Sequence, residues 1–229
     1  MAIVLHDLAG VEDRRFSPYC WRARLALHHK QLDHEARGVT YADIQAFSED
    51  YGSTTPVLDD NGHIVPDSGA IATYLEATYP DRPSLFGGEP GRALTRFVEN
   101  WTATAVHASL GGMVVKDIHD HVVEGDRAYF RQSREARFGA TLEATQTGRE
   151  DRLPDFRKGL APLRLTLRQQ PFLGGDAPIY ADYIVVAAFQ WARTISDFRL
   201  VEADDPVWHW IERLGDLHGG LLRDAPSYY

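Results

Sequence analysis

The pattern of apolar and polar positions changes near residue 80. Before that point, short apolar, β-branched segments alternate with segments of helical period, whereas a helical period prevails after it. Asn61-Gly62 stands between two short apolar runs, which is a strong signal for a β-hairpin. Ser17 and Pro18 are typical of the start of a helix. The first part therefore predicts the order β-α-β-α-β-β-α, with strands at residues 3–8 and 34–39, a hairpin within 54–65, and helices at 18–31, 40–51 and 69–78.

The second part predicts helices only. Residues 81–92 are rich in proline and glycine and predict a linker between a first domain at 1–80 and a second domain at 93–229. The nearly apolar stretch at 181–195 indicates a buried central helix. The remaining apolar stripes predict a long helix from residue 94 that bends at Gly111-Gly112, an antiparallel partner at 127–145, a helical stripe at 156–167 and a final amphipathic helix at 207–217.

Composition narrows the possible classes of protein. The chain has 229 residues, which suits one large domain or two small ones. Lys and Arg number 24 against 33 Asp and Glu, a net charge of −9, which argues against a nucleic-acid-binding surface. The longest apolar run is too short to span a membrane, and the first residues do not resemble a signal peptide. Cys20 is the only cysteine, so we expect no internal disulfide and a cytoplasmic location.

Candidate chemistry lies at two predicted helix starts. Ser17 opens the sequence Ser-Pro-Tyr-Cys at residues 17–20, which matches a Cys-Pro-Tyr-Cys redox motif with the first cysteine replaced. We therefore expect no dithiol exchange. A serine hydroxyl can instead accept an N–H of its own helix and donate its proton to a bound sulfur. Asp67 and Ser68 mark a second helix start, which is a natural anion site. The alternative for both places is an ordinary helix cap.

One further cluster has the composition of a metal site, namely Asp117, His119, Asp120 and His121. On a helix, residues two apart point in different directions, so a solvated polar face is favoured and no metal is predicted. The chain contains no glycine-rich phosphate-binding motif and no His-Glu-x-x-His motif, so a nucleotide cofactor is not expected either.

Three segments together resemble the glutathione transferase superfamily over nearly the whole chain. They are Ser-Pro-Tyr-Cys at 17–20, Thr-Pro at 55–56 followed by Asp-Ser-Gly-Ala-Ile at 67–71, and Tyr-Ala-Asp-Tyr at 180–183. The amino-acid sequence at residues 17–22, 27–30, 180–185 and 190–193 resembles that of bacterial lignin β-etherases and fungal-type transferases of the serine type. The resemblance implies a thioredoxin-like α/β N-terminal domain, an all-α C-terminal helical domain, and a homodimer.

The resemblance also implies roles for particular residues. Ser17 would stabilise the thiolate of glutathione, the co-substrate, and the backbone of Thr55, before a cis Pro56, would pair with its cysteinyl part. Asp67 would receive the γ-glutamyl ammonium, and Ser68 the neighbouring carboxylate. For the glycyl carboxylate, the region 40–52 offers Gln45. Asp182 would cap the central helix, without the reciprocal bond that a Ser or Thr in place of Ile179 would provide.

The second substrate would be an apolar, aromatic small molecule between the first helix and the long helices. Its candidate walls are Tyr19, Trp101, His107, Met113, Phe130 and Phe138, and for each of them a place in the core is the alternative. The implied reaction is attack of the thiolate on an electrophilic carbon, including cleavage of a β-aryl ether. The alternatives are a glutathione-dependent isomerase or dehalogenase, and a non-catalytic binder of aromatic molecules.

Overall fold

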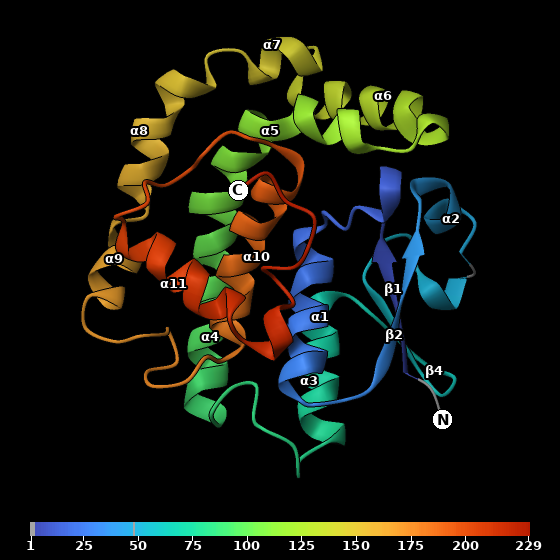
Figure 1. The fold of residues 1–229 in the computed structure, drawn as a ribbon. Helices are drawn as coiled ribbons and strands as arrows, with labels where there is room; N and C mark the ends of the chain where they lie inside the picture. The colour runs from blue at the N-terminus through green and yellow to red at the C-terminus, as the bar shows by residue number, and fades with distance from the viewer. Residues whose placement is uncertain (1–2, 48) are drawn as a thin grey trace.

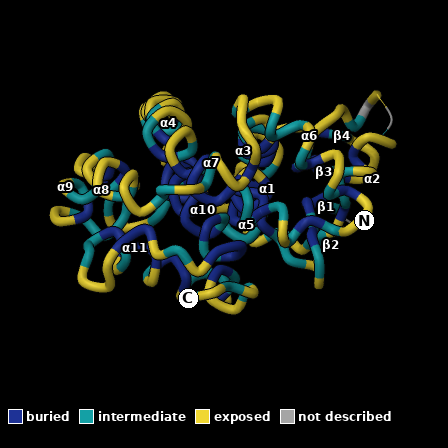
Figure 2. The backbone as a smooth tube through the Cα atoms, turned by 90° about the horizontal axis from the view of Figure 1, so that it is seen from above, coloured by how far each residue is buried: buried dark blue, intermediate teal, exposed yellow. Residues whose placement is uncertain are grey.

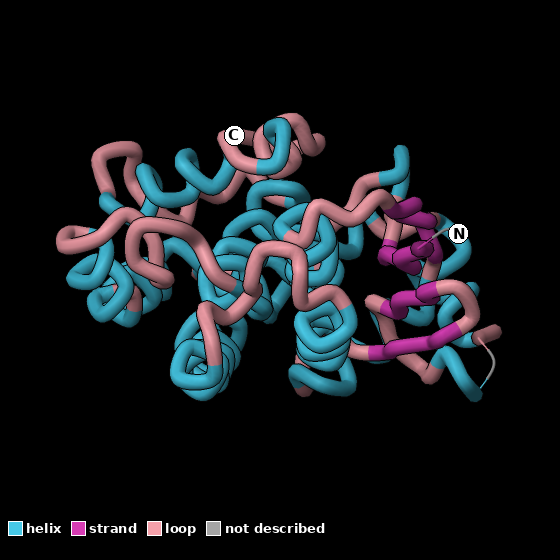
Figure 3. The backbone as a smooth tube through the Cα atoms, turned by 90° about the horizontal axis from the view of Figure 1, so that it is seen from below, coloured by secondary structure: helices cyan, strands magenta, loops and turns pink. Residues whose placement is uncertain are grey.

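The computed structural model describes residues 3–47 and 49–229 and has the predicted fold class (Figure 1). The first domain holds one mixed sheet with the strand order β2-β1-β3-β4. The pair β1–β2 is parallel, and the other two pairs are antiparallel. Figure 3 shows the strands gathered on one side of the molecule. The strands are β1 (Ile3–Leu8), β2 (His34–Val39), β3 (Val57–Asp60) and β4 (His63–Pro66).

Local signals begin and end the elements of this domain. Asn61 and Gly62 join β3 to β4 with φ angles of 55° and 91°, and two central residues with positive φ are the mark of a type I′ hairpin turn. Two of the helices start directly after the cap residues Ser17 and Asp67. The helices of the domain are α1 (Pro18–His29), α2 (Tyr41–Gln45) and α3 (Ser68–Thr78), with short 3₁₀ turns η1 (Val11–Asp13) and η2 (Glu49–Tyr51).

The second domain is helical, and α10 is its buried centre, as the apolar run at 181–195 predicts (Figure 2). Most residues of α10 are buried, because other elements pack around it. The helices are α4 (Glu89–Trp101), α5 (Ala108–His121), α6 (Arg127–Phe138), α7 (Leu142–Gln146), α8 (Arg149–Gly159), α9 (Ala161–Leu167), α10 (Tyr180–Ile195) and α11 (Pro206–Gly215). Shorter turns are η3 (Thr102–His107), η4 (Glu124–Asp126) and η5 (His218–Gly220).

Several predicted boundaries differ from the structure. The predicted helix at 40–51 is α2 followed by the 3₁₀ turn η2, and the predicted stripe at 156–167 is divided between α8 and α9. Helix α4 begins at Glu89, inside the predicted linker, because Pro90 lies in the first turn, where a missing N–H costs nothing. The predicted helix at 127–145 is divided into α6 and α7 by Gly139, whose φ of 70° ends α6. The long helix does not bend at Gly111-Gly112, which lie within α5. Its irregular turn is η3, a π-helix between α4 and α5.

The two domains share one interface, formed largely by α1 against α10. The Tyr180 hydroxyl donates to the Ser68 carbonyl oxygen at 2.8 Å, and the Tyr183 hydroxyl lies 2.6 Å from His29 Nδ1. Arg22 of α1 is buried and lies 3.4 Å from a carboxylate oxygen of Glu99 on α4. These contacts fix α1 and the start of α3 against the helical domain. Within the described residues, no helix combines the length and the apolar character needed to cross a membrane.

Candidate active site

A cavity of about 430 Å³ lies between the first domain and helices α5, α6 and α10. The first domain contributes the N-terminal end of α1, helix α2 and the loop that precedes β3. The second domain contributes the end of η3 and one face each of α5 and α6. The walls of the cavity are mostly apolar and aromatic with some polar groups, as is usual for a pocket that binds a small molecule.

Ser17 lies on the wall of this cavity at the N-terminus of α1. Its backbone is extended, so that its side chain turns back over the first turn of the helix. Ser17 Oγ accepts a hydrogen bond from the backbone N–H of Cys20 at 3.3 Å. This bond occupies one acceptor site of the hydroxyl, and the hydroxyl keeps its own proton as a donor.

Cys20 faces the core. The residue is 1% exposed, and its Sγ accepts from the Leu8 backbone N–H at 3.4 Å. Burial, followed by the charge of nearby Asp7, raises the pKa of the Cys20 thiol far above its ordinary value. Because the thiolate is the reactive form of cysteine, Cys20 is not placed for thiol chemistry.

The residues expected to hold glutathione divide into two groups. Thr55 and Gln45 line the cavity, and the Thr55–Pro56 peptide bond is cis. Asp67 and Ser68 lie outside this lining, at the N-terminus of α3. Asp67 Oδ1 accepts from the backbone N–H groups of Gly69 and Ala70 at 2.8 and 3.0 Å, so that this oxygen caps the helix. Ser68 is buried at the first position of α3.

Of the six residues expected to contact a second substrate, four line the cavity: Tyr19, His107, Phe130 and Phe138. Met113 and Trp101 do not. Helix α5 presents one face to the cavity, formed by residues spaced three or four apart: Ala108, Gly111, Val115 and Ile118. Met113 points away from this face and is completely buried in the core. Trp101 ends α4 and packs against the core.

The sequence analysis missed Tyr41, Arg134, Arg137 and Trp191, which also line the cavity. The signal for Arg134 was present, because it stands four residues after Phe130 and four before Phe138, on the same helical face. Burial raises the pKa of the Tyr41 phenol to about 12. Burial, together with the charge of Arg22, lowers the pKa of His107 to about 3. Tyr41 and His107 are therefore both uncharged near neutral pH.

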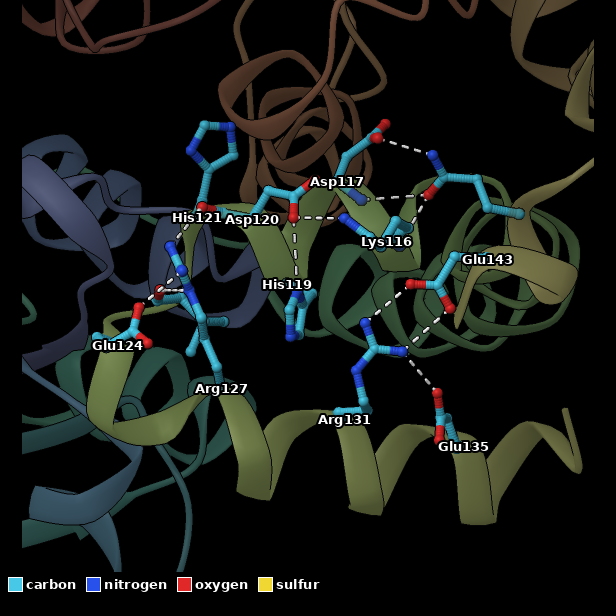
Figure 4. A network of polar contacts seen from close by, with 12 residues as sticks. Lys116, Asp117, His119, Asp120, His121, Glu124, Arg127, Arg131, Glu135 and Glu143 are labelled. Atoms are coloured by element: carbon cyan, nitrogen blue, oxygen red, sulfur yellow. Dashed lines mark hydrogen bonds and ion pairs between the residues drawn. The ribbon is translucent and has the colours of Figure 1, made fainter. Parts of the chain in front are cut away.

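Asp117, His119 and Asp120, three of the four α5 residues with the composition of a metal site, make charged contacts instead (Figure 4). Asp120 Oδ1 lies 2.5 Å from Lys116 Nζ and 3.5 Å from His119 Nδ1. Asp117 Oδ2 lies 2.6 Å from Arg149 Nη1 of α8. Only the Asp117–Arg149 pair joins α5 to another helix, α8. Within residues 3–47 and 49–229, no group of three or more His, Cys, Asp or Glu is arranged to hold a metal ion.

Two family models match the two domains of this chain. The family model described as "Glutathione S-transferase, N-terminal domain" matches residues 13–83, and that described as "Glutathione S-transferase, C-terminal domain" matches residues 93–217. The chain belongs to the glutathione S-transferase family. Membership implies glutathione as the co-substrate, which agrees with the sequence-based expectation.

Solved structures share this fold over almost the whole chain. A glutathione transferase of Phanerochaete chrysosporium is 28% identical, with a TM-score of 0.78 and coverage of 96% of this chain and 92% of that one. A glutathione S-transferase of Ceriporiopsis subvermispora, solved in complex with glutathione, is 24% identical, with a TM-score of 0.81 and coverage of 96% and 98%.

Among curated proteins, a maleylacetoacetate isomerase of Dictyostelium discoideum is 34% identical over 83 residues. The match covers 33% of this chain and only 38% of the isomerase. The chain thus shares only a part of that relative's length.

Proposed function

We propose that this protein is a serine-type glutathione transferase in which Ser17 stabilises the thiolate of bound glutathione. The observation that carries the proposal is the position of Ser17 on the cavity wall, at the N-terminus of α1, where its Oγ accepts from the Cys20 backbone N–H. Cys20, the other candidate in the same segment, is buried and stays protonated.

The energetics of this role are sufficient without a general base. Lowering the pKa of a thiol from about 8.5 by two units requires about 2.7 kcal/mol of preference for the thiolate. A hydrogen bond to a charged group supplies roughly 1.5–3 kcal/mol. The N-terminus of a helix adds roughly 0.3–1 kcal/mol. Ser17 and the amides of α1 can therefore keep a large part of the bound thiol ionised at neutral pH.

The rest of glutathione would extend along the first domain. The Thr55 backbone would pair with the cysteinyl part, and Gln45 would donate its side-chain amide to the glycyl carboxylate. The γ-glutamyl group would reach the N-terminus of α3, where the second carboxylate oxygen of Asp67 receives the ammonium and Ser68 the carboxylate. The positive end of the helix dipole favours an anion at this position.

The thiolate would attack an aromatic electrophile held against Tyr19, Phe130 and Phe138. In the β-etherase version of the reaction, the sulfur forms a bond to the carbon next to a ketone, and the C–O bond to the aryl group breaks. The electron pair of that bond leaves with the aryloxide, which then takes a proton from water. The resemblance of residues 17–22, 27–30, 180–185 and 190–193 to β-etherases supports this version.

A homodimer in the cytoplasm completes the proposal. Leu94 and Phe97 on α4 are 67% and 71% exposed, which is unusual for such large apolar side chains. They stand one turn apart on one helical face, which a second copy of the chain would cover. The single buried thiol, Cys20, suits a reducing compartment.

A glutathione-dependent isomerase is the second candidate. It is favoured by the match of 83 residues to the Dictyostelium maleylacetoacetate isomerase. An isomerase would return glutathione unchanged, whereas a transferase would consume one thiol for each conjugate formed. A non-catalytic binder would retain aromatic ligands and turn over none.

Titration of bound glutathione tests the role of Ser17. The ultraviolet absorbance of the thiolate is followed against pH in the wild type, Ser17→Ala and Ser17→Thr. Removing the hydroxyl should raise the pKa of the bound thiol by about 1–2 units, which corresponds to the loss of one charged hydrogen bond. Threonine keeps a hydroxyl and should restore most of the effect. An unchanged midpoint in Ser17→Ala would contradict the assigned role.

A further inference from the structure

The charge of the cavity wall is opposite to that of the whole chain. The chain carries a net charge of −9. Its cavity is lined by two arginines, Arg134 and Arg137, and the described lining residues include no aspartate or glutamate. His107 adds no charge, since its pKa is about 3. The wall at α6 is therefore positive.

The two arginines differ from their neighbour on the same helix. Arg131 makes ion pairs at 2.8 Å with both Glu135 and Glu143, which neutralise it. Arg134 donates to Ser133 Oγ at 2.5 Å, and in the described part of the chain neither Arg134 nor Arg137 forms an ion pair with a carboxylate. Helix α6 thus turns two uncompensated guanidinium groups towards the cavity.

Both guanidinium groups lie beside aromatic rings. The Arg134 guanidinium carbon is 4.8 Å from the centre of the Phe130 ring and 5.8 Å from that of Tyr41. The Arg137 carbon is 5.9 Å from the centre of the Phe138 ring. An arginine stacked on a ring is held in one orientation, and its outer N–H groups remain free to bind an anion in a bidentate manner.

We propose that the second substrate is an aromatic anion, of which an arylcarboxylate is the simplest form. Its ring would lie against the aromatic wall, and its carboxylate would be bound by Arg134 and Arg137. This inference rests on the proposed function of the cavity as a transferase site, and it adds the charge of the substrate. A charged hydrogen bond from a planar guanidinium to a carboxylate is among the strong polar contacts in proteins.

One other anion competes for the same arginines, namely the glycyl carboxylate of glutathione. Tyr41 begins α2, the helix that ends at Gln45, so the arginines stand near the region proposed for the glycyl end. Two arginines exceed what one carboxylate beside Gln45 needs, and both lie against rings on the α6 side. We therefore favour the second substrate over the glycyl carboxylate as the ligand of these arginines. The experiment below distinguishes the two ligands.

Calorimetric binding of para-nitrobenzoate and its methyl ester tests the proposal. The two ligands have the same ring and differ in charge, and neither reacts with the protein. The proteins are the wild type, the double variant Arg134→Gln/Arg137→Gln, and the single variant Arg137→Gln, in which the more exposed of the two arginines is changed. The matched control is Arg168→Gln, an exposed arginine at the end of α9 that does not line the cavity.

The wild type should bind the carboxylate about tenfold more tightly than the ester, in line with one well-formed charged contact. The preference should be lost in the double variant, reduced in Arg137→Gln and kept in Arg168→Gln. Equal binding of both ligands by the wild type, no binding of either, or a preference that survives the double substitution would overturn the proposal.

Glutathione is titrated into the same proteins. If the double variant loses affinity for glutathione but keeps its preference for the nitrobenzoate, the arginines serve the glycyl carboxylate and the proposal is wrong. Because the nitrobenzoate titration involves no thiol, it is independent of the Ser17 experiment. A failure of the transferase function and a failure of the anion preference are therefore distinguishable.

Discussion

Asp182 is the polar residue on which the start of the central helix depends. It lies at 0% exposure in the first turn of α10. Its two carboxylate oxygens accept from the backbone N–H groups of Leu173, Gly174 and Ile179 at 2.7, 3.1 and 3.0 Å, and from Trp210 Nε1 at 2.9 Å. Burial raises the pKa of this carboxyl, and the four donors act against that shift. The residue thereby joins the loop before α10, the helix itself and α11.

The substitution Asp182→Ala would leave four donors without a partner. One buried, unsatisfied donor costs about 1–3 kcal/mol, and relaxation and entry of water reduce the sum below four times that amount. We expect a loss of about 3–5 kcal/mol in the free energy of unfolding, similar to that found when a buried charge network is broken. For a chain of this size, 1 kcal/mol shifts Tm by about 2–4 °C, so Tm should fall by roughly 6–20 °C.

The Tm of Asp182→Asn should lie between those of Asp182→Ala and the wild type. The amide keeps one acceptor oxygen but turns an NH₂ group towards the remaining donors. Thermal unfolding followed by circular dichroism measures all three proteins. Asp176→Ala is the matched control, since Asp176 is an exposed aspartate in the same loop. The reasoning is refuted if Asp182→Ala melts within about 2 °C of the wild type, which corresponds to less than 1 kcal/mol, or if Asp176→Ala loses as much.

Two further predictions concern Cys20 and α4. Because burial and Asp7 raise the pKa of the Cys20 thiol, the native protein should not react with a disulfide reagent at mildly alkaline pH until denaturant exposes the thiol. If the native protein at once releases one equivalent of the reagent's thiol, Cys20 is accessible and this prediction is wrong. Replacing the exposed apolar pair, Leu94→Glu with Phe97→Glu, should convert the proposed dimer to a monomer in sedimentation equilibrium, because two charges would be buried in the interface. A wild type that is already monomeric, or a variant dimer of equal affinity, would contradict the proposed interface.

Much of the candidate site was predictable because its signals are local. Ser17 and Asp67 precede their helices directly, and each accepts from an N–H two or three residues further along the chain. Such bonds depend on neighbours in the sequence. The role of Asp182 was predictable only in part. Its bond to Ile179 is local, whereas its bond to Trp210 joins residues 28 positions apart.

The sequence alone determined the order of the elements, the division into a sheet domain and a helical domain, the hairpin at Asn61-Gly62 and the buried nature of α10. These properties follow from periodicity and from backbone preferences within a few residues. Only the tertiary structure decided which aromatic side chains meet in the cavity. Met113 and Trp191 are both large and apolar, and the rotation of each helix about its axis puts one in the core and the other on the wall.

The charge of that wall was likewise decided by tertiary structure. Arg131 and Arg134 stand one turn apart on α6 and look alike in the sequence, but only Arg131 meets a carboxylate from α7. Whether a charged side chain is neutralised depends on what a distant segment brings within a few ångströms of it. The packing of α6 against α7 and α2, which no local pattern encodes, leaves Arg134 and Arg137 beside the cavity without a carboxylate partner in the described part of the chain.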